Sequence, residues 1–90
     1  MITSNQMRAA RALLGIDQKQ LAGMADVSLP TVQRMEASDG VVRGTVDTLT
    51  KVVEALGRAG IELIGDDQRS EGGGRGVRLR EIGARFGRNA

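Results

Sequence analysis

The side chains best suited to directed hydrogen bonding form a short group at Thr31, Gln33 and Arg34. A glutamine amide and an arginine guanidinium can each make paired hydrogen bonds to a planar partner. The chain of 90 residues contains no histidine and no cysteine. It therefore lacks the usual acid–base group, any thiolate nucleophile or metal ligand, and any disulfide. These absences argue against an enzyme and against a metal or other cofactor, and they favour molecular recognition.

The charged residues are distributed unevenly along the chain. Residues 1–67 contain seven Lys/Arg and nine Asp/Glu, whereas residues 68–90 contain six Arg and two Glu. A basic C-terminal end is compatible with a polyanionic partner but does not identify one. The first residues lack a signal-peptide pattern, and no apolar run approaches the ~20 residues of a membrane-spanning helix. We expect a cytoplasmic protein that does not contact a membrane.

Helix starts are marked by one repeated pattern, in which an apolar residue precedes a capping residue and a second apolar residue follows five positions after the first. This spacing lets the two apolar side chains pack across the cap as a hydrophobic staple. Glutamine three positions after the cap adds a capping box in the first two cases. The three occurrences are Ile2-Thr3 with Met7, Ile16-Asp17 with Leu21, and Val27-Ser28 with Val32.

These starts predict helices over residues 4–14, 18–25 and 29–37, with Gly15 ending the first. A loop follows over residues 38–44, and Thr45 caps a fourth helix that ends before Gly60. The fourth helix has apolar residues at i, i+3, i+4 and i+7. With a single aromatic residue in the chain, the core must consist of aliphatic side chains and methionines, among them Met7, Met24 and Met35.

After Gly60 the pattern changes to that of short strands. Residues 61–64 and 76–80 are predicted strands, separated by a polar, glycine-rich loop over residues 65–75. They can pair within one chain or with a second chain. Residues 81–90 are a basic tail, frayed or forming a short helix. The sequence thus divides into a helical unit over 1–60, a strand pair over 61–80 and the tail over 81–90.

The two helices at 18–25 and 29–37 have the features of a close-packed pair. Ala22 is small where the helices must approach, and Asp26 lies in the tight turn between them. Val27 and Val32 fill the space between the helices, so the outer face of the second helix stays polar. An exposed helix of this width fits the major groove of DNA.

Residues 3–59 resemble the Cro/C1-type helix-turn-helix family, also called the XRE family. The resemblance rests on the segment 14–22, similar to the family's entry into its second helix, and on Val27-Ser28, Val32 and Met35-Glu36 in its recognition-helix frame. It implies a mainly α, compact four-helix (lambda-repressor-like) domain with a small C-terminal β-hairpin or strand pair. It also implies a sequence-specific regulator of transcription, most often a repressor, that binds double-stranded DNA as a homodimer at the nucleoid.

The resemblance assigns a role to individual positions. Gln18 and Arg43 would bind backbone phosphate, Gln33 and Arg34 would contact base edges, and Arg11 and Glu36 would form a structural ion pair. The sequence departs from members with glutamines at the start of the recognition helix, where it has Leu29 and Pro30. These two would make van der Waals contacts, for instance with a thymine methyl group. The full set of expected DNA-binding residues is Gln18, Ser28, Leu29, Pro30, Thr31, Gln33, Arg34 and Arg43.

A second hypothesis treats the protein as an antitoxin-type module that binds another protein through residues 61–90 and also regulates its own operon. In that case exposed apolar side chains of the C-terminal region would contact the partner. The candidates are Ile64, Val77, Leu79 and Phe86.

Overall fold

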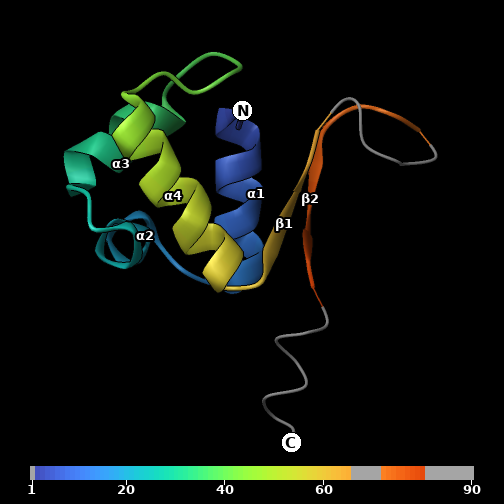
Figure 1. The fold of residues 1–90 in the computed structure, drawn as a ribbon, viewed down its shortest axis with the longest axis horizontal. Helices are drawn as coiled ribbons and strands as arrows, with labels where there is room; N and C mark the ends of the chain where they lie inside the picture. Colours follow the sequence, from blue (N-terminus) through green and yellow to red (C-terminus); the bar gives the residue numbers. More distant parts are fainter. Residues whose placement is uncertain (1, 66–71, 81–90) are drawn as a thin grey trace, which may run out of the picture.

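The computed structural model describes residues 2–65 and 72–80 (Figure 1). The chain forms four helices and then a two-stranded antiparallel sheet, as expected. The elements are α1 (Ser4–Leu14), α2 (Gln18–Ala25), α3 (Leu29–Glu36), α4 (Val46–Arg58), β1 (Ile61–Ile64) and β2 (Gly76–Leu79).

Each helix begins at the capping residue that the sequence predicts. Thr3 and Asp17 form complete capping boxes, and Ser28 and Thr45 accept a hydrogen bond from the backbone of their helix's third residue. Gly15 ends α1 in the left-handed conformation, with φ of 69°. The helix expected over 29–37 ends at Glu36, because Ala37 is its C-cap.

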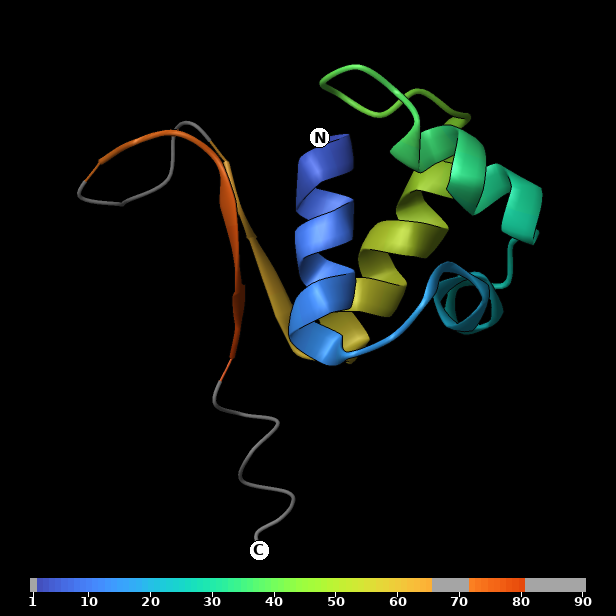
Figure 2. The same cartoon turned by 180° about the vertical axis from the view of Figure 1, so that it is seen from behind.

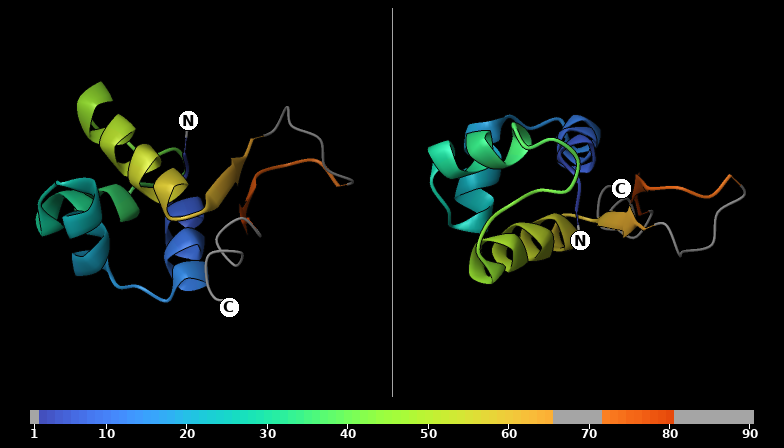
Figure 3. Two further views of the ribbon diagram at one scale, coloured as in Figure 1. Left: turned by 60° about the horizontal axis from the view of Figure 1, so that its bottom comes forward. Right: turned by 90° about the horizontal axis from the view of Figure 1, so that it is seen from above.

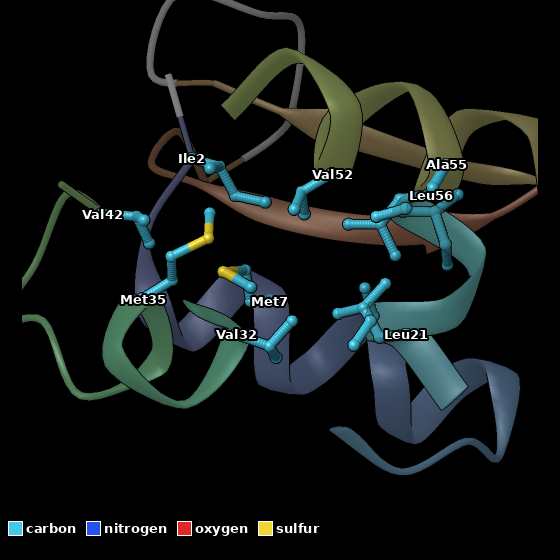
Figure 4. Packing of buried hydrophobic residues seen from close by; sticks show 13 residues of the cluster. Ile2, Met7, Leu21, Val32, Met35, Val42, Val52, Ala55 and Leu56 are labelled. Carbon is cyan, nitrogen blue, oxygen red and sulfur yellow. The ribbon is translucent and has the colours of Figure 1, made fainter. Parts of the chain in front are cut away.

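The core is formed by aliphatic side chains from all four helices, and Figure 4 shows Met7, Val32 and Met35 converging there. Truncating a fully buried residue of this size to alanine typically costs about 2–5 kcal/mol. The expectation for Met24 is wrong: its side chain is 37% exposed, because it lies on the outer side of α2. The largest fully buried side chains are Ile2, Met7, Leu21, Val32, Met35, Val52 and Leu56.

The two strands pair with each other within one chain, which settles the alternative that the sequence left open. Ile61 lies opposite Leu79 and Ile64 lies opposite Gly76. β2 ends at Leu79, one residue earlier than expected. The hairpin lies beside α1, on the side away from α2 and α3, as Figures 2 and 3 show from several directions.

One face of the hairpin packs on the helices. The hairpin therefore exposes less apolar surface to a partner protein than the sequence suggested. Ile61 is buried, and Leu63 and Val77 are half-buried against the core. Ile64 is half-buried, and of the apolar residues expected to be exposed here only Leu79 is, at 44%. Phe86, the 81–90 tail and residues 66–71 of the loop lie outside the described residues.

None of the helices in the described part of the chain has the length and apolar character of a membrane span.

Candidate nucleic-acid interface

The turn between α2 and α3 is set by the backbone of Asp26, which has φ of 57° and is the C-cap of α2. The backbone N–H of Val27 donates to the Ala22 carbonyl at 3.1 Å and closes the turn. Ala22 is buried where the two helices meet, as expected from its small size. Figure 2 shows that α3 leaves this turn at a steep angle to α2.

The outer face of α3 is formed by Pro30, Gln33 and Arg34, which are spaced at i, i+3 and i+4 and are all exposed. The opposite face buries Val32 and Met35 in the core. Within the residues that the structure describes, the side chains of Gln33 and Arg34 have no hydrogen-bond or ion-pair partner. Two long polar side chains with unused donors therefore project from one exposed helix face.

The start of α3 combines a cap with apolar residues. The Ser28 hydroxyl accepts from the Thr31 backbone at 3.2 Å and lies 2.8 Å from the Thr31 hydroxyl. This contact orients both hydroxyls at the rim of the exposed face. Leu29 is half-buried and packs against the core, so only part of its side chain faces outward. Pro30 occupies the first turn, where its missing N–H has no cost.

Arg11 and Glu36 form the ion pair that the resemblance implies. The Arg11 Nε lies 2.7 Å from one carboxylate oxygen of Glu36, and its Nη2 lies 2.8 Å from the other. Burial raises the pKa of the Glu36 carboxyl, but the hydrogen bonds from Arg11 and Gln18 and the positive charges of Arg11 and Arg8 together outweigh this effect. The pKa of Glu36 is therefore lower than its usual value, and the carboxylate is charged at neutral pH.

Gln18 has a structural contact that the sequence did not predict. Its Nε2 donates to a Glu36 oxygen at 3.0 Å, which holds the start of α2 against the end of α3. An amide nitrogen carries two hydrogens, so one donor remains. The Gln20 and Leu21 backbone N–H groups are used by Asp17, whereas those of Gln18 and Lys19 have no partner among the described residues. The start of α2 thus offers free donors to an anion.

Lys19 was not among the predicted site residues. It is exposed and comes directly after Gln18. Its position in the first turn of a helix whose N–H groups are free is the signal that sequence analysis had available.

Arg43 lies in the loop between α3 and α4. Its backbone N–H donates to the Ser38 hydroxyl at 3.4 Å, and the same hydroxyl lies 3.5 Å from the Arg34 carbonyl oxygen. Ser38 thus ties the loop to the end of α3. In the described part of the chain no acidic side chain pairs with the Arg43 guanidinium. Arg8, also missed from sequence, donates to the Glu36 carbonyl and supports the same end of α3.

The geometry is that of two helices crossing at a tight turn, with the second exposing a polar face. The family model for Cro/C1-type helix-turn-helix proteins matches residues 7–63, well over half of the chain. The chain belongs to this family. No curated protein matches the chain significantly.

Members of the Cro/C1-type helix-turn-helix family bind DNA and regulate transcription, and they are not usually enzymes. The match begins at Met7 within α1, covers α2, α3 and α4 completely and reaches into β1. It thus includes the helix-turn-helix pair and the loop with Arg43. Double-stranded DNA is accordingly the ligand class of this family.

Proposed function

We propose that this protein is a sequence-specific repressor of transcription that reads the major groove of double-stranded DNA with α3. The observation that carries the proposal is the exposed face of Gln33 and Arg34, whose side chains have no partner among the described residues. Arginine suits the paired acceptors of guanine, and glutamine suits the donor and acceptor of adenine. Groups poised in this way make their hydrogen bonds without first breaking internal ones.

The neighbouring residues complete the proposed contact. Thr31 and Ser28 present hydroxyls to a phosphate or a base edge, and their mutual hydrogen bond orients them. Pro30 and the exposed part of Leu29 make van der Waals contacts, with a thymine methyl group as the favoured partner. The apolar start of α3 therefore recognises a base by van der Waals contact, at the position where other members of the family have glutamines that can form hydrogen bonds.

Phosphate contacts position the protein on the duplex. Gln18, the backbone at the start of α2 and the Lys19 side chain contact one strand, and Arg43 contacts the backbone from the loop. Residues 2–60 contain seven Lys/Arg and six Asp/Glu, so the helical part has almost no net charge and electrostatic attraction alone gives weak binding. Specific affinity must then come from base contacts and from a second protomer.

We propose a homodimer that reads two half-sites about 34–36 Å apart. Its interface lies on the side of α1 and the hairpin, where Leu13 is 45% exposed and Leu79 is 44% exposed. Ala9 and Ala12 are uncharged exposed residues of α1, and the exposed cation of that helix, Arg8, is held at the end of α3 by the Glu36 carbonyl. On the hairpin Arg78 is paired with Glu62, which limits like-charge repulsion in a two-fold contact between two copies of this face.

The interface is tested by sedimentation of the full chain and of Leu13→Glu. A charge placed at the centre of the contact should convert the dimer to a monomer. Val46→Glu is the matched control, because Val46 is an apolar residue 78% exposed at the start of α4. A wild-type monomer at tens of micromolar, or equal masses for wild type and Leu13→Glu, contradicts the proposed interface. In the first case an unrelated partner protein becomes the better occupant of this face.

The DNA-reading proposal is tested by selecting duplexes from a random pool with the purified full chain. We expect one enriched motif arranged as an inverted repeat. Placing that motif across a promoter in a reporter strain should lower expression when the protein is present. Enrichment of no motif contradicts sequence-specific reading, and higher expression contradicts repression.

A further inference from the structure

The Gln6 side chain joins two parts of the molecule that are far apart in sequence. It is only 4% exposed. Its Nε2 donates to the Ile64 carbonyl at 3.1 Å and to the Gly76 carbonyl at 2.8 Å, so it spans both strands of the hairpin. Its Oε1 accepts from the Thr3 backbone at 2.9 Å. Both amide hydrogens and the amide oxygen of this buried side chain are therefore used.

The N-terminal segment that Gln6 holds is also bonded to the loop before α4. Thr3 forms an antiparallel bridge with Val41. The Val42 backbone donates to the Ile2 carbonyl at 2.9 Å, and the Ser4 backbone donates to the Gly40 carbonyl at 3.0 Å. A chain terminus is ordered only when it is tied down, and here the hairpin provides one of the ties. Arg43 follows directly after this bonded stretch.

A continuous set of contacts therefore runs from the hairpin through Gln6 and residues 2–4 to the loop with Arg43. We infer that Gln6 is a positioning residue for DNA binding. Through Gln6 the hairpin holds Arg43 where its side chain can contact a backbone phosphate of the DNA. The inference rests on the proposed function, since it assigns the hairpin a part in that function.

The decisive variant is Gln6→Glu in the full chain. A glutamate at this position still accepts the Thr3 backbone N–H, as in a standard capping box. It cannot donate to the two hairpin carbonyls, and it places a carboxylate beside them. The start of α1 is thus kept while the contact with the hairpin is broken. Gln6→Met is the second variant, because it removes the contact without adding charge.

Affinity for the selected duplex is measured in a double-mutant cycle with Arg43→Ala. We expect Gln6→Glu to weaken binding about tenfold, the loss of one charge-assisted contact. In the Arg43→Ala background the same change should alter affinity by less than about twofold. A role confined to stability, or a long-range effect of the new charge, would lower affinity equally in both backgrounds, and that result overturns the inference. Glu62→Gln, on the outer face of the hairpin, is the control.

Amide hydrogen exchange supplies an independent reading. Exchange of residues 40–44 should accelerate in Gln6→Glu and Gln6→Met, while that of α3 stays at the wild-type rate. Unchanged exchange in the loop contradicts the inference. If both variants are unfolded, Gln6 is a folding determinant and the inference is wrong. A wild-type chain that binds no duplex refutes the proposed function and this inference together. If the effects of Gln6→Glu and Arg43→Ala on the binding free energy are additive, only the inference is refuted.

Discussion

Both carboxylate oxygens of Glu36 accept hydrogen bonds from the guanidinium of Arg11, at 2.7 Å and 2.8 Å. Glu36 is only 4% exposed and Arg11 is 20% exposed. The pair joins α1 to the end of α3, and Gln18 extends the contact to α2. A single buried carboxylate thus fixes the orientation of three helices behind the exposed face of α3.

Breaking this pair should destabilise the fold strongly. Glu36→Gln removes the charge that compensates Arg11, at a cost of about 3 kcal/mol. In a domain of this size the midpoint of thermal unfolding should fall by more than about 10 °C. The double variant Arg11→Met with Glu36→Met should recover much of the loss, because it leaves no unpaired charge. A Glu36→Gln midpoint within about 2 °C of wild type would show that the pair contributes little.

The same pair predicts the acid sensitivity of the fold. The pKa of Glu36 in the folded protein is lower than the ordinary value of 4.5, since its hydrogen bonds and the nearby arginine charges together outweigh the effect of burial. Its contribution to stability is therefore complete above about pH 4.5 and is lost as the pH falls through the folded-state pKa. Urea unfolding between pH 3 and pH 7 should show a steeper acid loss for wild type than for Glu36→Gln. Parallel curves for the two proteins contradict this assignment.

Arg34 should govern sequence discrimination. Arg34→Ala is expected to weaken binding to the selected duplex about 10- to 100-fold, because a bidentate base contact is lost. Arg34→Lys keeps the charge but not the paired donors, so it should retain non-specific binding and lose discrimination. Since the side chain is exposed and unpaired within the described structure, the thermal midpoint should not change. Fluorescence anisotropy with matched and scrambled duplexes measures both effects, and undiminished discrimination by Arg34→Lys would refute a base contact.

Arg43 should contribute equally to the affinity for DNA duplexes of any sequence. If it binds a phosphate, Arg43→Ala lowers the slope of log affinity against log salt concentration by about 1. Matched and scrambled duplexes should lose affinity by the same factor. Arg78→Ala is the control, because Arg78 lies on the hairpin and pairs with Glu62. A change in discrimination, or an unaltered salt slope, would argue that Arg43 does not bind phosphate.

The turn between α2 and α3 offers a stabilising substitution. Asp26 has the left-handed conformation, which costs a residue with a Cβ about 1 kcal/mol. Asp26→Gly should raise the free energy of unfolding by roughly 0.5 kcal/mol, after the greater chain entropy of glycine is subtracted. Gly15→Ala is the converse test, since Gly15 has φ of 69°. This substitution should lower the free energy of unfolding by about 1 kcal/mol. Chemical denaturation of both variants checks the signs, and a less stable Asp26→Gly would contradict this explanation.

Much of the helical unit was predictable because its signals are local. Capping residues such as Thr3, Asp17 and Ser28 and their flanking apolar residues act within one helical turn, so the sequence contains the whole interaction. The spacing of Gln33 and Arg34 from Val32 and Met35 likewise places them on opposite helix faces. The exposure of Met24 was not predictable, because a short helix with small residues can turn several sides toward the core.

The amino-acid sequence by itself determined where the helices begin, which face of α3 is apolar and which polar side chains it presents, since these depend on spacing along one element. Only the tertiary structure decided that the strands pair within one chain, that Gln18 bonds to Glu36 and that Gln6 reaches Ile64 and Gly76. Such contacts join residues 12 to 70 positions apart, from the Ile64–Gly76 strand pair to the hydrogen bond from Gln6 to Gly76. They depend on how packed elements meet in space, which no local pattern of residues encodes.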